Sequence, residues 1–210
     1  MSHLLYVESS PRKQRSASIE VAQTFLAAYQ DTHPEVLIDT LDVWSTPLPE
    51  FNGAVLEAKY AGINGVPLSA EQSDAWATVR ALAARFQRAA RLLVSVPMWN
   101  FGIPYKLKHL IDCVSQKDLL FTFDEGGLNG ALQDRRAAVI YARGIEYGPA
   151  SGTPAASYDL QRQYVELWLR FVGITDISTI LVEKTFFGPE IDGAARQAAK
   201  HEARAIAANF

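Results

Sequence analysis

Apolar and polar positions along the chain alternate between a pattern typical of strands and a pattern typical of helices. Short apolar runs bounded by polar or turn-forming residues predict five strands. These runs occupy residues 4–7, 36–41, 92–96, 137–142 and 174–182. Apolar residues three and four positions apart predict a helix after each run. These helices cover residues near 16–29, 69–86, 104–114, 160–171 and 194–208.

The order of these elements predicts the fold class. Strands that alternate with helices form a parallel sheet with helices on both faces. Five such strands fit a flavodoxin-like, doubly wound α/β sheet in a single domain that spans residues 1–210. In such a sheet the first, third and fourth strands are neighbours, so the loops that follow them open on one edge. Ligands of open α/β sheets bind there, outside the carboxyl ends of the strands.

Two segments interrupt the alternation. Residues 43–68 carry three prolines and three glycines, and this length predicts an excursion with a functional or partner-facing role. The motif Ser69-Ala70-Glu71-Gln72 predicts a capping box at the start of the next helix. Residues 119–130 begin with a short β-like run and continue into a glycine-rich stretch, which predicts a second, shorter excursion.

Composition and charge exclude several classes of protein. The 210 residues are 49% hydrophobic, which suits one domain with a sizeable core. The net charge of -3 and the lack of a basic stripe argue against a nucleic-acid partner. One cysteine, Cys113, allows no internal disulfide and predicts a reducing, cytoplasmic location. We expect no membrane association, because no run approaches the roughly 18 apolar residues of a membrane span.

The loop after the first predicted strand carries hydroxyl groups beside a helix start. Ser10, Ser16 and Ser18 supply these hydroxyls, next to the backbone N–H groups of the helix N-terminus. Such donors favour a phosphate, through hydrogen bonds and the helix macrodipole. The loop has neither the Walker A pattern nor the G-x-G-x-x-G dinucleotide pattern. The simpler alternative is a helix-capping serine in a solvated loop, and composition alone favours that alternative.

The loop after the third predicted strand, residues 97–102, combines aromatic rings with an amide and a glycine. Trp99 or Phe101 can lie against a planar ring system, and Asn100 offers a donor and an acceptor to the edge of a heterocycle. The alternative is a structural loop in which Met98 and Phe101 fill the core and Asn100 caps a turn. Taken alone, the loop favours neither interpretation.

The run Ala142-Arg143-Gly144-Ile145 follows the fourth predicted strand and completes the edge. A phosphate at the first loop and a planar ring at the other two describe flavin mononucleotide (FMN). The convergence of three loops on one edge therefore predicts an FMN site, although no single loop does.

Other chemistries lack the residues that they need. The histidines, His3, His33, His109 and His201, are far apart and have no metal-ligand spacing, so we expect no metal site. No G-x-S-x-G motif marks a serine hydrolase. Cys113 lies within a helical pattern, which favours burial over catalysis.

Motifs spread over nearly the whole chain resemble those of the FMN-dependent NADH-azoreductases, a family also described as NADH:quinone reductases. Residues 97–101, Pro-Met-Trp-Asn-Phe, resemble the family's flavin loop and are the most specific match. Residues 5–10 resemble its opening strand with the first phosphate serine, and residues 16–18 resemble its Ser-x-Ser phosphate clamp. Residues 171–176 and 187–190 match later segments of the family.

The resemblance implies a homodimer with non-covalent FMN at each of two interface sites. NADH or NADPH would reduce the flavin in a ping-pong mechanism, and quinones or azo compounds would accept the two electrons. The chemistry would occur at flavin N5, without a catalytic side chain. The alternatives are a flavodoxin-type electron carrier and a non-enzymatic FMN-binding protein. The near-neutral charge and the 43–68 segment argue against a carrier.

The resemblance also implies the residues of the site. The phosphate would be held by Ser10, Ser16, Ala17 and Ser18. The rest of the cofactor would contact Pro97, Met98, Trp99, Asn100, Phe101, Ala142, Arg143, Gly144 and Ile145. The substrate pocket would include Phe123 and Tyr147. Many members carry Ser-Arg-Gly-Gly where this chain has residues 142–145, so one hydroxyl and one glycine are missing here.

Overall fold

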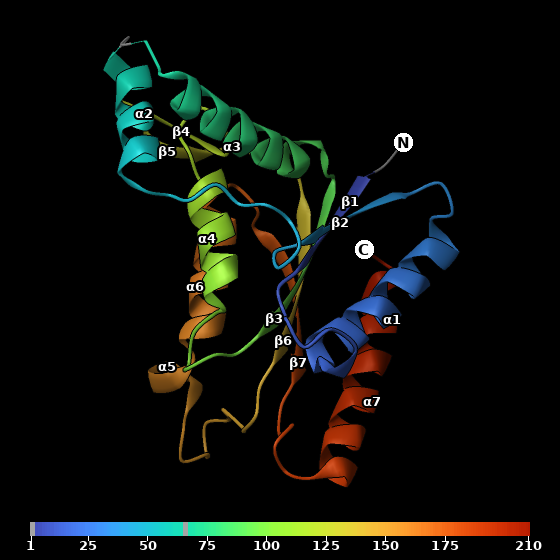
Figure 1. Ribbon diagram of the computed structural model, residues 1–210. Coiled ribbons are helices and arrows are strands. Elements are labelled where there is room, and N and C mark those ends of the chain that lie inside the picture. The colour runs from blue at the N-terminus through green and yellow to red at the C-terminus, as the bar shows by residue number, and fades with distance from the viewer. Residues whose placement is uncertain (1–2, 65–66) are drawn as a thin grey trace.

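A five-stranded parallel sheet with the strand order β2-β1-β3-β6-β7 forms the centre of the protein (Figure 1). The computed structural model describes residues 3–64 and 67–210. The strands are β1 (His3–Glu8), β2 (Leu37–Asp42), β3 (Arg91–Pro97), β6 (Arg136–Ala142) and β7 (Asp176–Val182). This order confirms the predicted flavodoxin-like, doubly wound sheet, in which β1, β3 and β6 are neighbours.

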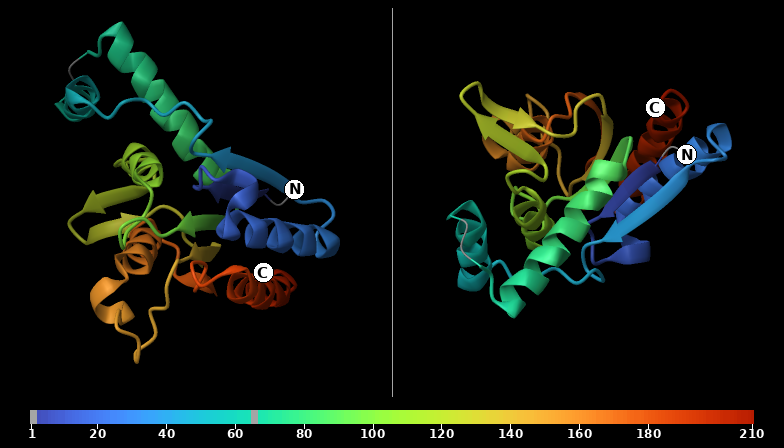
Figure 2. Two further views of the ribbon diagram at one scale, coloured as in Figure 1. Left: turned by 60° about the horizontal axis from the view of Figure 1, so that its bottom comes forward. Right: turned by 90° about the horizontal axis from the view of Figure 1, so that it is seen from above.

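Helices cover both faces of the sheet, as the sequence predicts. One face carries α1 (Ala17–Thr32) and α7 (Pro189–Ala207), which lie side by side (Figures 1 and 2). The other face carries α3 (Ala70–Arg88), α4 (Tyr105–Val114) and α6 (Leu160–Phe171). A hydrophobic cluster fills the space between the sheet and each helix layer. The central strands β1, β3 and β6 are buried on both sides and are nearly continuous apolar runs in the sequence, whereas the edge strands β2 and β7 are partly exposed.

Successive side chains of each strand belong to opposite clusters. In β1, Leu5 and Val7 pack on the α3, α4 and α6 side, whereas Tyr6 packs on the α1 and α7 side. Pairing in register carries this arrangement across the sheet, since Val7 pairs with Val94 and Val94 pairs with Val139. The carboxyl ends of these strands therefore reach the same edge of the sheet.

The segment 43–68 contains a helix that the apolar pattern did not predict. Helix α2 (Gly53–Asn64) packs against α3. Its apolar residues are spread around the helix rather than gathered in one stripe, so the sequence gives little helical periodicity. The predicted capping box is confirmed, because the Ser69 hydroxyl accepts from the Gln72 N–H and the Gln72 side chain accepts from the Ser69 N–H.

The second excursion, residues 119–130, contains an antiparallel hairpin of β4 (Phe121–Asp124) and β5 (Gly127–Gly130). The hairpin comes directly before β6 and lies toward the amino-terminal ends of the sheet strands (Figure 1). The last helix, α7, begins at Pro189 and so starts earlier than predicted. Its first turn is rich in polar residues, which hides it from an apolar pattern. Two short elements, η1 (Lys13–Arg15) and α5 (Ala155–Tyr158), complete the structure.

Hydrogen bonds beyond the strand ladders join the carboxyl ends of β1, β3 and β6. The Ser9 N–H donates to the Ser95 carbonyl at 3.3 Å, and the Met98 N–H donates to the Ala142 carbonyl at 2.8 Å. The three loops that follow these strands consequently open on one edge, the lower end in Figure 1. Across residues 3–64 and 67–210, no helix combines the length and the apolar character needed to cross a lipid bilayer.

Candidate active site

The loop after β1 leads into the N-terminus of α1 without a side-chain cap. Ser16 is the N-cap residue, yet its hydroxyl accepts no hydrogen bond from the first turn of the helix. That hydroxyl instead lies 3.1 Å from the Ser18 hydroxyl, and both side chains are buried. The capping alternative is therefore not what the structure adopts. Two hydroxyls and the first-turn N–H groups, including that of Ala17, together form a set of neutral donors suited to an anion.

Ser10 lies in the same loop and is also buried. Its hydroxyl oxygen accepts a hydrogen bond from the Arg12 N–H at 3.3 Å. The neighbouring Ser9 hydroxyl donates to the Ser95 carbonyl at 2.6 Å and so fixes the start of the loop to β3. The loop is thus held in place by the sheet, with Ser10 at the same edge as Ser16.

Lys13, a cation of the same loop, is paired with carboxylates. The Lys13 ammonium contacts Glu8 at 2.7 Å and Asp42 at 2.5 Å. Burial alone would lower the pKa of Lys13, but the hydrogen bonds that its ammonium donates to Asp42 and Glu8 outweigh burial and raise that pKa. Lys13 therefore fastens η1 to β1 and β2, and its charge is already balanced by these two carboxylates.

The loop after β3 forms a tight turn with two left-handed residues. Asn100 has a φ of 48° and Phe101 a φ of 68°. Trp99 and Gly102 close the turn, since each N–H donates to the carbonyl of the other at 3.1 and 2.9 Å. Left-handed φ is tolerated by asparagine but is strained for a large residue such as phenylalanine. Such strain is characteristic of functional sites. The turn holds the Asn100 side chain at an exposed tip.

The structural alternative for this loop required Met98 and Phe101 to fill the core. Phe101 is 44% exposed, and its ring lies 5.6 Å from that of Tyr158. Met98 is half-buried and is tied to β6 through its backbone. The loop therefore presents an aromatic ring and an amide at the sheet edge rather than contributing Phe101 to the core.

Trp44 is a site residue that the sequence analysis missed. Its ring lies 5.9 Å from that of Trp99 and 5.4 Å from that of Tyr105, and its indole N–H donates to the Ser9 carbonyl at 3.0 Å. Trp44 thus links the loop after β1 to the turn at residues 99–102. Its position soon after β2, at the same edge of the sheet, was a signal that could have identified it.

The loop after β6 combines a buried arginine with a glycine in close contact. The guanidinium of Arg143 is buried and bonded to Asp159, Gln161 and Glu183. A Cβ at Gly144 would lie 2.4 Å from the ring of Phe186, so a larger residue there would require that ring to move. Phe186 is itself 78% exposed and is another residue that the sequence analysis did not single out. The Arg143 side chain is engaged within the protein, and its contact with a cofactor stays a prediction.

The rest of this loop is less open than its neighbours. Ala142 is buried, and Ile145 is partly buried. Tyr147 is also buried, and its ring lies 5.2 Å from the Arg143 guanidinium carbon. Burial raises the pKa of the Tyr147 hydroxyl, although the Arg143 charge partly offsets the rise. Tyr147 also lines a pocket of about 700 Å³ beside Arg143 and Asp159, and its contact with a substrate stays a prediction.

Phe123 is not brought to this edge within one chain. It lies on the β4–β5 hairpin and is 62% exposed. The hairpin lies toward the other end of the sheet from the three loops (Figure 1). A substrate contact by Phe123 stays a prediction and requires a second copy of the chain to supply it.

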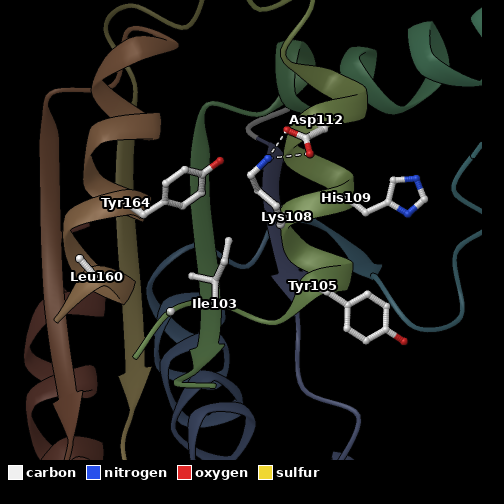
Figure 3. A pocket seen from close by; sticks show the side chains of 8 residues that line it. Ile103, Tyr105, Lys108, His109, Asp112, Leu160 and Tyr164 are labelled. Atoms are coloured by element: carbon white, nitrogen blue, oxygen red, sulfur yellow. Dashed lines mark hydrogen bonds and ion pairs between the residues drawn. The ribbon is translucent and has the colours of Figure 1, made fainter. Parts of the chain in front are cut away.

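A groove of about 560 Å³ lies between α4 and α6, beside the turn at residues 99–102. Figure 3 shows Leu160 and Tyr164 of α6 facing Lys108 of α4, which pairs with Asp112 at 2.6 Å. Tyr105 points to the other side of α4, as Figure 3 also shows. The lining residues are Gly102, Ile103, Tyr105, Lys108, His109, Asp112, Leu160 and Tyr164.

Neither a thiol nor a metal centre is available at the described site. Cys113 is buried on α4, and burial raises the pKa of its thiol to about 12, so the thiolate nucleophile is suppressed. Across residues 3–64 and 67–210, no group of three or more His, Cys, Asp or Glu side chains is arranged to hold a metal ion. The donors at the sheet edge instead fit FMN, with neutral donors for its phosphate and a rigid turn with a free amide for its ring.

Comparisons with known proteins agree with this architecture. The family model described as a flavodoxin-like fold matches residues 2–207. An FMN-dependent NADH:quinone oxidoreductase of Burkholderia lata is 53% identical over 213 residues, and the match covers 100% of both chains. Another, from Pseudomonas fluorescens, is 46% identical over 208 residues and covers 99% of this chain and 96% of the relative. The crystal structure of an azoreductase from Bacillus anthracis matches with a TM-score of 0.91 at 26% identity, over 100% of both chains. The chain therefore belongs to the flavodoxin-like fold family and, within it, to the FMN-dependent NADH:quinone oxidoreductases.

Proposed function

We propose that this chain is an FMN-dependent oxidoreductase that oxidises NADH and reduces quinones or azo compounds. The observation that carries the proposal is the convergence of three loops on one sheet edge, where neutral donors lie beside a rigid aromatic turn. The names of the curated relatives and of the structural neighbour support the same activity. Bound FMN would supply a ring that accepts a hydride and then releases two electrons.

The protein's own residues would bind and orient this cofactor. Ser10, Ser16 and Ser18, with the Ala17 N–H, would hold the phosphate. Asn100 and the Phe101 N–H would bond the polar edge of the ring, assisted by the Gly144 N–H. We call the loops after β3 (residues 97–102) and after β6 (residues 142–145) the ring loops. Their other residues would enclose the rest of the cofactor: Pro97, Met98, Trp99, Ala142, Arg143 and Ile145.

Donor and acceptor would use the same site in turn, which is a ping-pong mechanism. The chain has no G-x-G-x-x-G motif, so a second, separate dinucleotide site is not expected. NADH or NADPH would therefore bind at the open edge, leave as the oxidised form, and vacate the edge for the acceptor. No side chain need supply a proton, because the exposed edge admits water.

Two further predictions from the sequence accompany this proposal. The first is that residues 1–210 act as a single domain; the packing of α1 on α7 brings early and late parts of the chain together and supports it. The second is a cytoplasmic location, which fits a buried, unpaired Cys113.

Turnover by the purified protein tests the proposal. With added FMN we expect a flavin absorption band on the protein, bleaching by NADH, and reoxidation by a quinone. Initial rates measured against NADH at several quinone concentrations should give parallel double-reciprocal lines, as a ping-pong mechanism requires. The same series with NADPH shows which donor the protein prefers. Flavin binding without NADH turnover would indicate an electron carrier instead, and the lack of any flavin band would contradict the proposal outright.

The phosphate assignment makes a separate prediction. Replacing both Ser16 and Ser18 by alanine should weaken FMN binding by roughly 1–3 kcal/mol, because phosphate oxygens lose their hydroxyl partners. Riboflavin, which lacks the phosphate, should bind the variant and the wild type alike. Thr24→Ala, on the same helix, is the matched control and should leave both affinities unchanged. Unchanged FMN affinity in the double variant would place the phosphate elsewhere.

We also propose a homodimer that covers the α4–α6 groove and brings FMN to the interface. Exposed apolar side chains surround the groove and the turn, including Leu160 at 57%, Tyr105 at 62% and Phe101 at 44% exposure. Such a concentration of exposed apolar surface is typical of an interaction site. A second copy would also bring the exposed Phe123 within reach of a site that its own chain does not approach.

Solution mass measured by light scattering tests the dimer. Leu160→Glu should convert a dimer into a monomer and weaken FMN binding, because it buries a carboxylate beside the Lys108–Asp112 pair in a groove that the second copy would cover. Leu37→Glu, at an equally exposed position on β2, is the control and should remain dimeric. A wild-type protein that is monomeric with FMN bound would contradict the proposal.

A further inference from the structure

Arg143 is the centre of a buried polar cluster at the carboxyl ends of the strands. Its guanidinium bonds Gln161 Oε1 at 3.2 Å and Glu183 Oε1 at 3.1 Å, and it also bonds Asp159 Oδ2. The Arg143 side chain is only 2% exposed. We call Arg143, Asp159, Gln161 and Glu183 the Arg143 cluster. A buried cation needs such complete pairing, because an unpaired one would be strongly destabilising.

The cluster is joined to the backbone of several elements at once. Gln161 Nε2 donates to the Val96 carbonyl at 2.9 Å, which reaches the end of β3. The Arg143 N–H donates to the Val182 carbonyl at 2.8 Å, at the end of β7. Asp159 Oδ1 accepts the Arg162 N–H at 2.8 Å and so caps α6. One guanidinium therefore connects β3, β6, β7 and the start of α6.

These connections end next to both ring loops of the proposed cofactor site. Val96 immediately precedes the segment 97–101, and Arg143 immediately precedes Gly144. The Arg143 carbonyl also accepts from the Thr185 N–H at 3.2 Å and the Thr185 hydroxyl at 3.0 Å, which fixes the peptide between Arg143 and Gly144. The phosphate loop has no part in the cluster; α1 lies on the opposite face of the sheet.

We propose that Arg143, Asp159 and Gln161 are positioning residues that hold the ring end of the FMN site and leave the phosphate end unaffected. The inference rests on the proposed function. The planar guanidinium fork bonds several acceptors in fixed directions, which a lysine ammonium does not. Replacing a buried ionic cluster by apolar residues is often neutral or stabilising, so stability alone does not require this arrangement. Directional control of Gly144 and of the 97–101 segment would account for it.

Affinities for FMN and riboflavin, measured on the same variants, test the inference. Asp159→Asn keeps the size of the side chain and its Oδ1 cap, and Gln161→Leu removes both bonds made by the amide. We expect each variant to lose roughly tenfold or more in affinity for FMN and the same factor for riboflavin. The ratio of the two affinities reports the phosphate alone and should stay at the wild-type value. The absorption band and the midpoint potential of the bound flavin should shift toward those of free FMN.

Arg162→Gln is the matched control, because Arg162 makes an exposed ion pair with Glu166 on the same helix. It should leave both affinities and the potential unchanged. If Gln161→Leu does not fold, Asp159→Asn carries the test. Variants with a lower melting temperature but wild-type affinities and potential would overturn the inference, and so would a loss confined to FMN. A wild-type protein that binds neither flavin would instead overturn the proposed function itself.

Discussion

Parallel pairing of β1, β3 and β6 is the constraint on which the rest of the structure depends. The register Val7–Val94–Val139 brings three strands to one edge together, and the loops after them share that edge. Hydrogen bonds from Ser9 to Ser95 and from Met98 to Ala142 continue the sheet into the loops. A ligand site assembled from three separate loops is possible because one sheet positions all of them.

The two faces of the sheet contribute different parts of the site. Helix α1, on one face, presents Ser16, Ser18 and its uncapped first turn, and these groups suit a phosphate. On the other face, α6 begins at the Arg143 cluster beside Gly144, and α4 follows the turn at residues 99–102. Trp44 spans the two parts through the Ser9 carbonyl and the Trp99 ring. This division is why phosphate binding and ring binding can be separated by substitution.

Local patterns in the sequence predicted most of the fold and the sheet edge at which the three loops meet. Strands buried on both faces are continuous apolar runs, so β1, β3 and β6 were identifiable. Helix α2 was not, because its apolar residues do not form one stripe. The partners of Arg143 could not be predicted from local patterns either, since Asp159 is 16 and Glu183 is 40 positions away along the chain. The contact between Phe186 and Gly144 could not be predicted for the same reason, since the two residues are far apart along the chain and meet only in the fold.

Hydrogen exchange of the protein with and without FMN tests most directly whether the three loops form one cofactor site. The account predicts slower exchange on FMN addition for the N–H groups of Ala17, Ser18, Phe101 and Gly144, in all three loops together. The N–H groups of the last turn of α1, which ends at Thr32 far from all three loops, serve as the internal reference. Protection confined to one loop, or to the α4–α6 groove with the three loops unchanged, would contradict the account.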